Sequence, residues 1–212
     1  MKLAMNMIRQ YADIPVTPEE YTQRMIMTGT AVEGTEDISG GMEKVVVGRV
    51  LTCTDVEGTH LHECTVDVGG PETLHIVCGA PNVAAGQLVP VALDGAHLPG
   101  GVKIKKGKLR GMISEGMICS GEELHVPTEL YPNIEEKGIL VFQEDYPLGA
   151  DVKPILGIDD TAVDFEILAN RPDCLSVWGV ARESATVLGE HFVMRVFARR
   201  GVRVHAQHAR LR

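Results

Sequence analysis

The most distinctive chemical feature of this sequence is a short basic run, KIKKGKLRG, which ends at Gly111. It holds five cations in nine residues, whereas the whole chain has 29 acidic and 20 basic residues and a formal net charge of −9. A local cluster of lysine and arginine can neutralise neighbouring phosphate groups and release their counterions. The run therefore predicts contacts with a phosphate backbone. The side chains expected to make them are Lys103, Lys105, Lys106, Lys108 and Arg110.

The backbone conformation of this run decides which cations can act together. In an extended strand alternate residues point to opposite sides, so the first two lysines should share one side and the other three cations the opposite side. Gly107 lies between the two groups and suits a bulge or a turn. An alternative interpretation is a solvated hairpin whose lysines keep an edge strand from pairing with another chain.

Three polar residues extend the predicted site beyond the basic run. Ser114 and Ser120, in SEGMICSGEEL, supply hydroxyl groups beside a strand end, and Asn82, in GAPN, suits a base edge or a ribose. Each also has an ordinary interpretation as a turn residue. Aromatic residues make up only 4% of the chain, which argues against a platform for stacking unpaired bases. We expect contacts to the backbone and shape of a folded RNA.

Other residue types predict no catalysis. The five cysteines are widely spaced and include no Cys-x-x-Cys pair, which argues against a zinc ribbon and a disulfide framework. His60, His62 and Cys64 would share one face of a strand, as metal ligands do, but no fourth ligand lies nearby in the sequence. The chain has no phosphate-binding glycine loop and no nucleophile–base arrangement. We expect no catalytic residue, no metal and no cofactor in this chain.

The residues that must position the site have the pattern of a small β-barrel. Residues 40–150 contain short β-branched runs separated by glycine and proline. Five strands with tight turns suit a closed barrel, because closure removes exposed strand edges, and an OB-type barrel is the expected form. The predicted strands lie in KVVVGRVLTC, LHECTVDVG, TLHIVCG, QLVPVAL and GILVF.

The regions on either side of residues 40–150 have sequence patterns that predict helices as well as a strand. Residues 1–39 are expected to be helical, with Thr17 as an N-cap and Glu20 completing a capping box. Residues 151–190 predict a strand in DTAVDFEIL and then a helix that Asp173 caps and Gly189 ends. The simplest arrangement is an α+β fold in which an OB-fold β-barrel is inserted into a discontinuous small α/β domain. No apolar run is long enough to span a membrane, and the start has no signal-like core, which favours a cytoplasmic location.

Three long stretches carry a family resemblance. They are MKLAMNMIRQYADIPVTPEEYTQRMIMTGTAVEG, IVCGAPNVAAGQLVPVALDGAHLPGGVKIKKGKLRGMISEGMICSGEEL and FEILANRPDCLSVWGVARE. Together they resemble the N-terminal part of bacterial phenylalanine–tRNA ligase β subunits, in order from residue 1 to about residue 190. The resemblance implies an outer α/β domain in two segments, 1–39 and 151–190, interrupted by an OB-fold tRNA-binding domain at 40–150.

The same resemblance implies a function. The chain would be the tRNA-binding and assembly portion of a subunit that supports ATP-dependent aminoacylation of tRNA(Phe) in an α2β2 enzyme. It would not catalyse the reaction alone, and ATP and magnesium would serve the parent enzyme. The implied partners are the phosphate backbone of tRNA, the catalytic α subunit and the rest of the β subunit, without a membrane.

Two departures from the family pattern keep an alternative open. The turn after the first barrel strand reads TDVEGTHL, where such modules usually have His-Pro-x-Ala-Asp, so Asp55 and Glu57 stand near the expected path of RNA phosphates. Residues 191–212 form an atypical basic tail, with arginines and no acid from Arg195 onward. A shifted reading frame, an artificial end or a lineage-specific extension would each give such a tail. The alternative function is a stand-alone OB-fold protein-interaction module without an RNA role.

Overall fold

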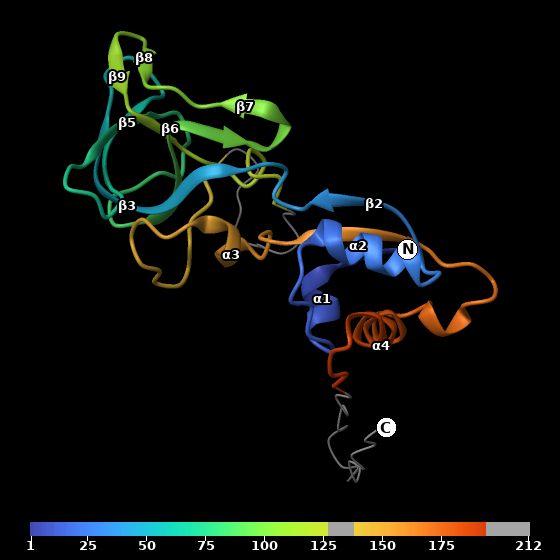
Figure 1. Cartoon of the computed structure of the whole chain (residues 1–212). Coiled ribbons are helices and arrows are strands. Elements are labelled where there is room, and N and C mark those ends of the chain that lie inside the picture. Colours follow the sequence, from blue (N-terminus) through green and yellow to red (C-terminus); the bar gives the residue numbers. More distant parts are fainter. Residues whose placement is uncertain (127–137, 194–212) are drawn as a thin grey trace, which may run out of the picture. The chain divides into compact units, whose positions relative to one another are not determined.

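Contacts within the chain divide it into two compact units, and the computed structural model describes residues 1–126 and 138–193 (Figure 1). One unit, here named the split unit, joins Met1–Glu36 with Asp160–Arg212. The other, named the central unit, is Asp37–Asp159. None of the helices in the described ranges is long and apolar enough to cross a membrane.

A curled antiparallel sheet forms the central unit. Its strands follow one another in the order β10, β6, β3, β4 and β5, and β7 pairs with the C-terminal end of β6. Strands β8 and β9 form a separate hairpin. The bounds are β3 Glu43–Asp55, β4 His62–Asp67, β5 Leu74–Cys78, β6 Leu88–Leu98, β7 Val102–Lys103, β8 Gly107–Leu109, β9 Met112–Ser114 and β10 Gly116–Ile118.

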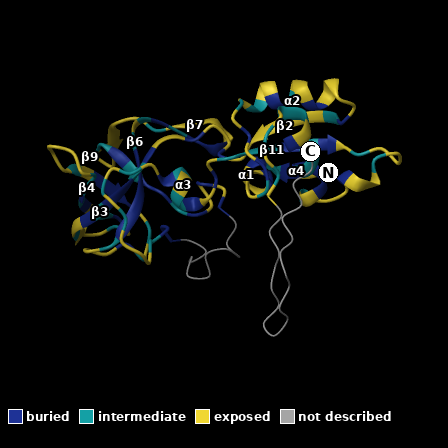
Figure 2. Cartoon of the chain, turned by 60° about the horizontal axis from the view of Figure 1, so that its bottom comes forward, coloured by how far each residue is buried: buried dark blue, intermediate teal, exposed yellow. Residues whose placement is uncertain are grey.

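Branched apolar side chains are buried on both faces of this sheet. Gly48 of β3, Val66 of β4 and Val91 of β6 share one face of the sheet, where the two valines are buried in one apolar cluster. Val45 and Val47 of β3 lie on the opposite face and are buried in a second cluster. The dark blue stretches of the central unit in Figure 2 mark buried residues of this kind. Gly48 has no room for a side chain, because a Cβ there would lie 2.6 Å from Cγ2 of Val91. The sheet therefore closes around a core in which even one extra methyl group would clash.

A short helix, α3 (Val152–Leu156), belongs to the core of the central unit. Asp151 caps it by accepting a hydrogen bond from the backbone N–H of Lys153 at 2.9 Å. The first and last residues of α3 are buried in the same apolar cluster as Met42. A boundary at residue 150 would therefore remove part of the core of this unit.

The expected strand in GILVF does not form. The segment makes two isolated bridges instead, between Ser120 and Ile139 and between Leu88 and Phe142. Strand β10 takes the place beside β6. Ile139 and Leu140 are buried, so the apolar character of this segment serves packing and not a ladder of backbone hydrogen bonds.

The split unit combines a three-stranded sheet with helices. The sheet order is β1, β11 and β2, with β1 antiparallel to β11. The expectation of a wholly helical first segment is wrong, because β1 and β2 are strands; β2 is largely exposed, so its sequence lacks the alternation that would predict it. The bounds are β1 Lys2–Ala4, α1 Met5–Arg9, α2 Pro18–Met27, β2 Ala31–Asp37, β11 Thr161–Glu166, the 3₁₀ turn η3 Pro172–Cys174 and α4 Val177–Leu188.

The helix ends in this unit test the predicted caps. The Thr17 hydroxyl accepts a hydrogen bond from the backbone of Glu20 at 3.3 Å, which confirms the N-cap of α2. Gly189 ends α4 in the left-handed conformation, as predicted. The predicted cap at Asp173 is wrong. That residue lies in η3, so α4 begins later and Ser176 caps it by accepting a backbone hydrogen bond at 3.0 Å.

Candidate nucleic-acid interface

The basic run does not form one strand. Lys103 ends β7, Lys105 and Lys106 connect β7 to β8, Lys108 is the central residue of β8, and Arg110 lies in the turn that follows. All five residues are exposed. The simple alternation expected of one extended strand therefore does not apply, and the cations are presented by two short strands, a link and a turn.

A tight turn sets the end of the β8–β9 hairpin (Figure 1). Leu109 pairs with Met112, which leaves two residues in the loop. These are Arg110 with φ 48° and Gly111 with φ 91°. Positive φ at both central positions defines the type I′ turn, whose twist suits a hairpin. The turn places the arginine at the tip of the hairpin, in a backbone conformation that is uncommon outside glycine.

Four of the five cations are available for an external anion. Within residues 1–126 and 138–193, no hydrogen bond or ion pair is formed by the side chains of these four. Exposed and unpaired ammonium and guanidinium groups are the donors that phosphate oxygens accept from. The four are Lys103, Lys105, Lys108 and Arg110.

Lys106 differs from the other four cations because the chain itself uses it. Its ammonium group pairs with the Glu115 carboxylate, and its backbone N–H donates to Oδ1 of Asp94 at 2.8 Å. The hydrogen bond to Glu115 raises the pKa of Lys106, and the same bond lowers the pKa of Glu115. Lys106 thus fixes the position of the basic hairpin.

Glu115 and Ser114 join the hairpin to the edge of β5. The backbone N–H of Glu115 donates to the His75 carbonyl at 2.8 Å, and its carboxylate accepts from the His75 N–H at 3.0 Å. The Ser114 hydroxyl accepts from the Val77 N–H at 3.1 Å and donates to the Gly116 carbonyl at 2.9 Å. These contacts, named the seam, satisfy backbone groups that the edge of the curled sheet would otherwise leave unpaired.

Replacing Glu115 with glutamine is expected to remove a part of the stability that depends on pH. The pKa of Glu115 in the folded chain lies below its ordinary value of 4.5, so its contribution is fully present above that value. The contribution is lost as the pH falls through the folded pKa. The urea midpoint of the variant should therefore be lower than that of the original chain at pH 7, and the difference should shrink below about pH 4.

Glu57→Gln, in the exposed turn after β3, is the matched control and should leave the urea midpoint unchanged at both pH values. A difference for Glu115→Gln that is equally large at pH 7 and at low pH would contradict the role of the carboxylate charge in the seam.

Asn82 and Ser120, the other two predicted contacts, lie together beside residues 138–139. The Asn82 amide donates to the Ile139 carbonyl at 3.1 Å and accepts from the Ile139 N–H at 2.8 Å. The Ser120 hydroxyl donates to the Glu123 carboxylate at 2.9 Å and accepts from the Glu123 N–H at 3.2 Å. Both side chains therefore hold local backbone, and the structure does not place them on the basic hairpin.

Sequence reasoning missed the acids that hold this hairpin. Asp94 and Glu115 stand 12 and 9 residues from Lys106 in the sequence, so no local spacing connects them. Only the folded arrangement of β6, of the link before β8 and of the turn after β9 brings them together. Asp55, which was expected near RNA phosphates, accepts a hydrogen bond from His62 Nδ1 across a 2.9 Å contact.

One group of candidate metal ligands exists among the described residues. The ligand atoms of Asp173, Cys174 and Glu183 lie within 4.8 Å of one another. The Arg171 guanidinium already supplies the positive charge there, 2.8 Å from Glu183 and 3.3 Å from Asp173. It lowers the pKa of Asp173, while burial raises the pKa of Cys174. This cluster is an internal ion-pair network and does not suit a metal ion.

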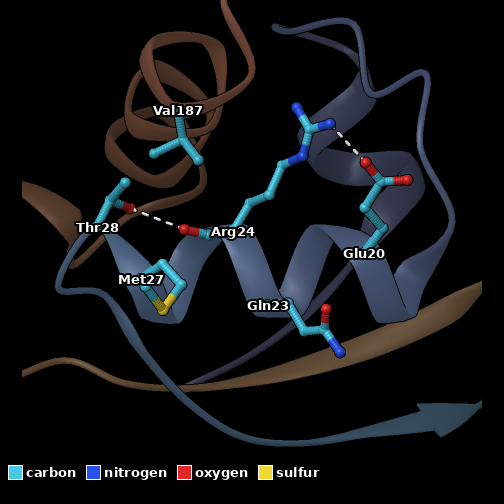
Figure 3. Close-up of a pocket in the computed structure, with 6 residues that line it drawn as sticks. All are labelled: Glu20, Gln23, Arg24, Met27, Thr28 and Val187. Carbon is cyan, nitrogen blue, oxygen red and sulfur yellow. Dashed lines mark hydrogen bonds and ion pairs between the residues drawn. The ribbon is translucent and has the colours of Figure 1, made fainter.

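A surface depression of about 390 Å³ lies beside α2 (Figure 3). Figure 3 shows Arg24 directed toward Glu20, with which it forms an ion pair along the helix. The Thr28 hydroxyl donates to the Arg24 carbonyl at 3.1 Å. Met27 and Val187 supply apolar contacts. Since its charged groups neutralise each other, the depression offers no chemistry for catalysis.

Comparison with known proteins defines the class of the central unit. Residues 45–151 match the family described as putative tRNA binding domain. The match covers half of the chain and includes β3–β10 with the basic hairpin, and the chain belongs to this family.

The relatives of the whole chain are more specific. It is 43% identical over 196 residues to the phenylalanine–tRNA ligase β subunit of Lactobacillus johnsonii, which covers 90% of this chain and 24% of that protein. The corresponding subunits of Latilactobacillus sakei and Streptococcus mutans are 44% and 45% identical over 195 and 187 residues, covering 91% and 88% of this chain. This confirms the predicted resemblance. The chain spans about a quarter of the length of these relatives.

A solved structure, a MetRS related protein from Pyrococcus horikoshii, matches 50% of this chain and 85% of its own length with 22% identity and a TM-score of 0.34.

Proposed function

We propose that this chain is the tRNA-binding and assembly portion of a phenylalanine–tRNA ligase β subunit. The observation that carries the proposal is that the segment matching tRNA binding domains also contains the basic hairpin, four of whose cations have no side-chain partner within the described ranges 1–126 and 138–193. Elsewhere in the central unit acids are frequent, so a polyanion would be attracted at the hairpin and repelled nearby. Such a charge pattern orients a bound RNA on the barrel.

The contacts in this proposal are made to phosphate. Lys103, Lys105, Lys108 and Arg110 donate to phosphate oxygens, while Lys106 acts indirectly through Glu115 by holding the hairpin. The predicted contacts of Asn82, Ser114 and Ser120 remain predictions, and their hydroxyl and amide groups would have to serve RNA in addition to the backbone. With few aromatic residues available for stacking, the recognised feature is the backbone of a folded tRNA.

The domain organisation is part of the same proposal. An OB-type barrel is inserted into a discontinuous α/β domain, and the barrel domain runs over 37–159, so that α3 is included. Residues 37–159 alone are expected to unfold in one cooperative transition with β-type circular dichroism. Residues 42–150 should be less stable by about 3 kcal/mol or more, since two buried side chains of α3 are lost. If 37–159 aggregates while the whole chain folds, the insertion is wrong.

The remaining partners would act outside this chain. The catalytic α subunit and the rest of the β subunit would complete an α2β2 enzyme in the cytoplasm, with ATP and magnesium bound there. The described residues do not fit magnesium, because their one cluster of metal-ligand type is neutralised by Arg171. No step of aminoacylation is therefore assigned to this chain.

Binding of fluorescently labelled tRNA as a function of salt concentration tests the proposal. Residues 1–193 are expected to bind with a log affinity that falls linearly with log salt, since each phosphate contact releases counterions. Ending the chain at residue 193 removes the arginines of the tail, which would otherwise bind RNA without specificity. Absence of tRNA binding at low salt would favour the alternative of a protein-interaction module.

A further inference from the structure

The central unit contains a pair of cysteines that the proposed RNA interface does not use. Cys53 in β3 and Cys64 in β4 are direct cross-strand partners. At the end of this ladder the Val56 N–H donates to the Leu61 carbonyl at 2.9 Å. Hydrogen-bonded and non-hydrogen-bonded pairs alternate along an antiparallel ladder. Counting from that bond, the two cysteines occupy a non-hydrogen-bonded pair.

This position suits a covalent link between the two side chains. Opposite residues of a non-hydrogen-bonded pair have Cα atoms about 4.5 Å apart, which lies inside the range of about 4.4 to 6.8 Å found in disulfides. Both side chains belong to the same apolar cluster on the inner face of the sheet. No backbone movement is needed to bring them together.

The two thiols differ in their access to solvent. Cys64 is fully buried, and burial raises its pKa to about 12. Cys53 is partly exposed, and its thiol lies 3.7 Å from the Val83 carbonyl oxygen. A small reagent therefore reaches Cys53 first. Cys78 of β5 is also buried and lies opposite His62, not opposite either cysteine of the pair.

We propose that Cys53 and Cys64 are a redox modification site that forms a reversible cross-strand disulfide. The oxidant is a small-molecule disulfide. The Cys53 thiolate attacks one of its sulfurs, the reagent's S–S bond breaks, and one thiolate leaves and takes up a proton. The Cys64 thiolate then attacks the Cys53 sulfur and expels the second reagent thiolate, which is also protonated. Two protein thiols are oxidised and one reagent disulfide is reduced to two thiols.

The disulfide would fix the pairing of β3 with β4 next to an irregularity in their register. The register of this pair shifts at a bulge between Val50 and Thr52, immediately before Cys53. A one-residue slip in a strand exchanges its inner and outer faces. The disulfide would prevent such slippage and restrict the unfolded chain, so oxidation should raise the thermal midpoint of the chain.

Treatment of the full chain with oxidised glutathione, followed by alkylation and mass spectrometry, tests the site. The expected product has lost two hydrogens, retains no glutathione, gives a peptide joining Cys53 to Cys64, and returns to the starting mass with dithiothreitol. Cys64→Ala should instead retain one glutathione on Cys53. Cys78→Ala should form the same link as the original chain.

Two results would overturn the site. One is a stable glutathione adduct on Cys53 in the original chain, and the other is a link that maps to Cys78. Cys53→Ala provides a test that does not depend on replacing a fully buried residue, and it should give no intramolecular link. Circular dichroism verifies that each variant is folded before it is oxidised.

Discussion

Replacing Lys105 and Lys108 with glutamate is expected to weaken tRNA binding and to flatten its salt dependence. Both side chains are exposed, and reversal leaves the contact between Lys106 and Glu115 intact. Each phosphate contact contributes about 0.7 to 0.9 to the slope of log affinity against log salt. Losing two contacts should reduce the slope by roughly 1.4 to 1.8 and the affinity at moderate salt by about tenfold or more. Fluorescence anisotropy with labelled tRNA and residues 1–193 measures both quantities.

A matched control separates local contacts from net charge. Lys2→Glu combined with Arg24→Glu changes the net charge by the same amount in the split unit, where both cations only form exposed ion pairs. It should leave the salt slope nearly unchanged. Equal slopes for the original chain and the Lys105/Lys108 variant would show that the hairpin is solvated and does not contact RNA. Reversal at Lys106 is unsuitable, since it would also disrupt the seam.

Much of the central sheet could be predicted from the sequence because its strands are short β-branched runs bounded by glycine and turn residues. The run around Val66 alternates between buried and half-buried residues, whereas the runs around Val47 and Ile76 also bury consecutive residues, and all three became strands. The segment GILVF has the same apolar character but lies at the rim of the sheet, where it makes isolated bridges. Apolar composition reports burial, and it does not distinguish a strand from a buried loop.

The candidate site was predictable only in part, for a related reason. The sequence identifies which residues are cationic, but their availability depends on tertiary partners. Lys106 pairs with Glu115, and Ser114 holds the edge of β5, while Lys105 and Lys108 of the same run are unpaired in the described part of the chain. The local sequence around the basic run does not show which cations are paired and which are available. The paired acid, Glu115, and the edge of β5 lie outside this run.

The glycine in the motif NRPDCLSVWGVARE also has a role that only the tertiary structure reveals. Gly179 lies in the first turn of α4, and a Cβ at this position would lie 1.8 Å from the carbonyl oxygen of Asp173 and 3.2 Å from Cα of Cys174. Both neighbours are backbone atoms of η3, so no side-chain rotation can relieve the clash. The close approach also brings Asp173 and Cys174 to the Arg171 network. Any side chain at this position should separate η3 from α4.

Gly179→Ala is therefore expected to destabilise the split unit by about 3 kcal/mol, the upper part of the range for overpacked cores. The sign is the test, because alanine in place of glycine within a helix ordinarily stabilises by about 1 kcal/mol. Trp178 is the single tryptophan of the chain and adjoins the site, so its fluorescence during urea unfolding reports on this unit. Gly34→Ala is the matched control in the same unit, since a Cβ there meets nothing within 4 Å, and its urea midpoint should stay close to that of the original chain. A midpoint for Gly179→Ala that is equal to or higher than that of the original chain would mean that η3 does not lie against α4, and the assigned contact of Arg171 with Glu183 of α4 would then also be wrong.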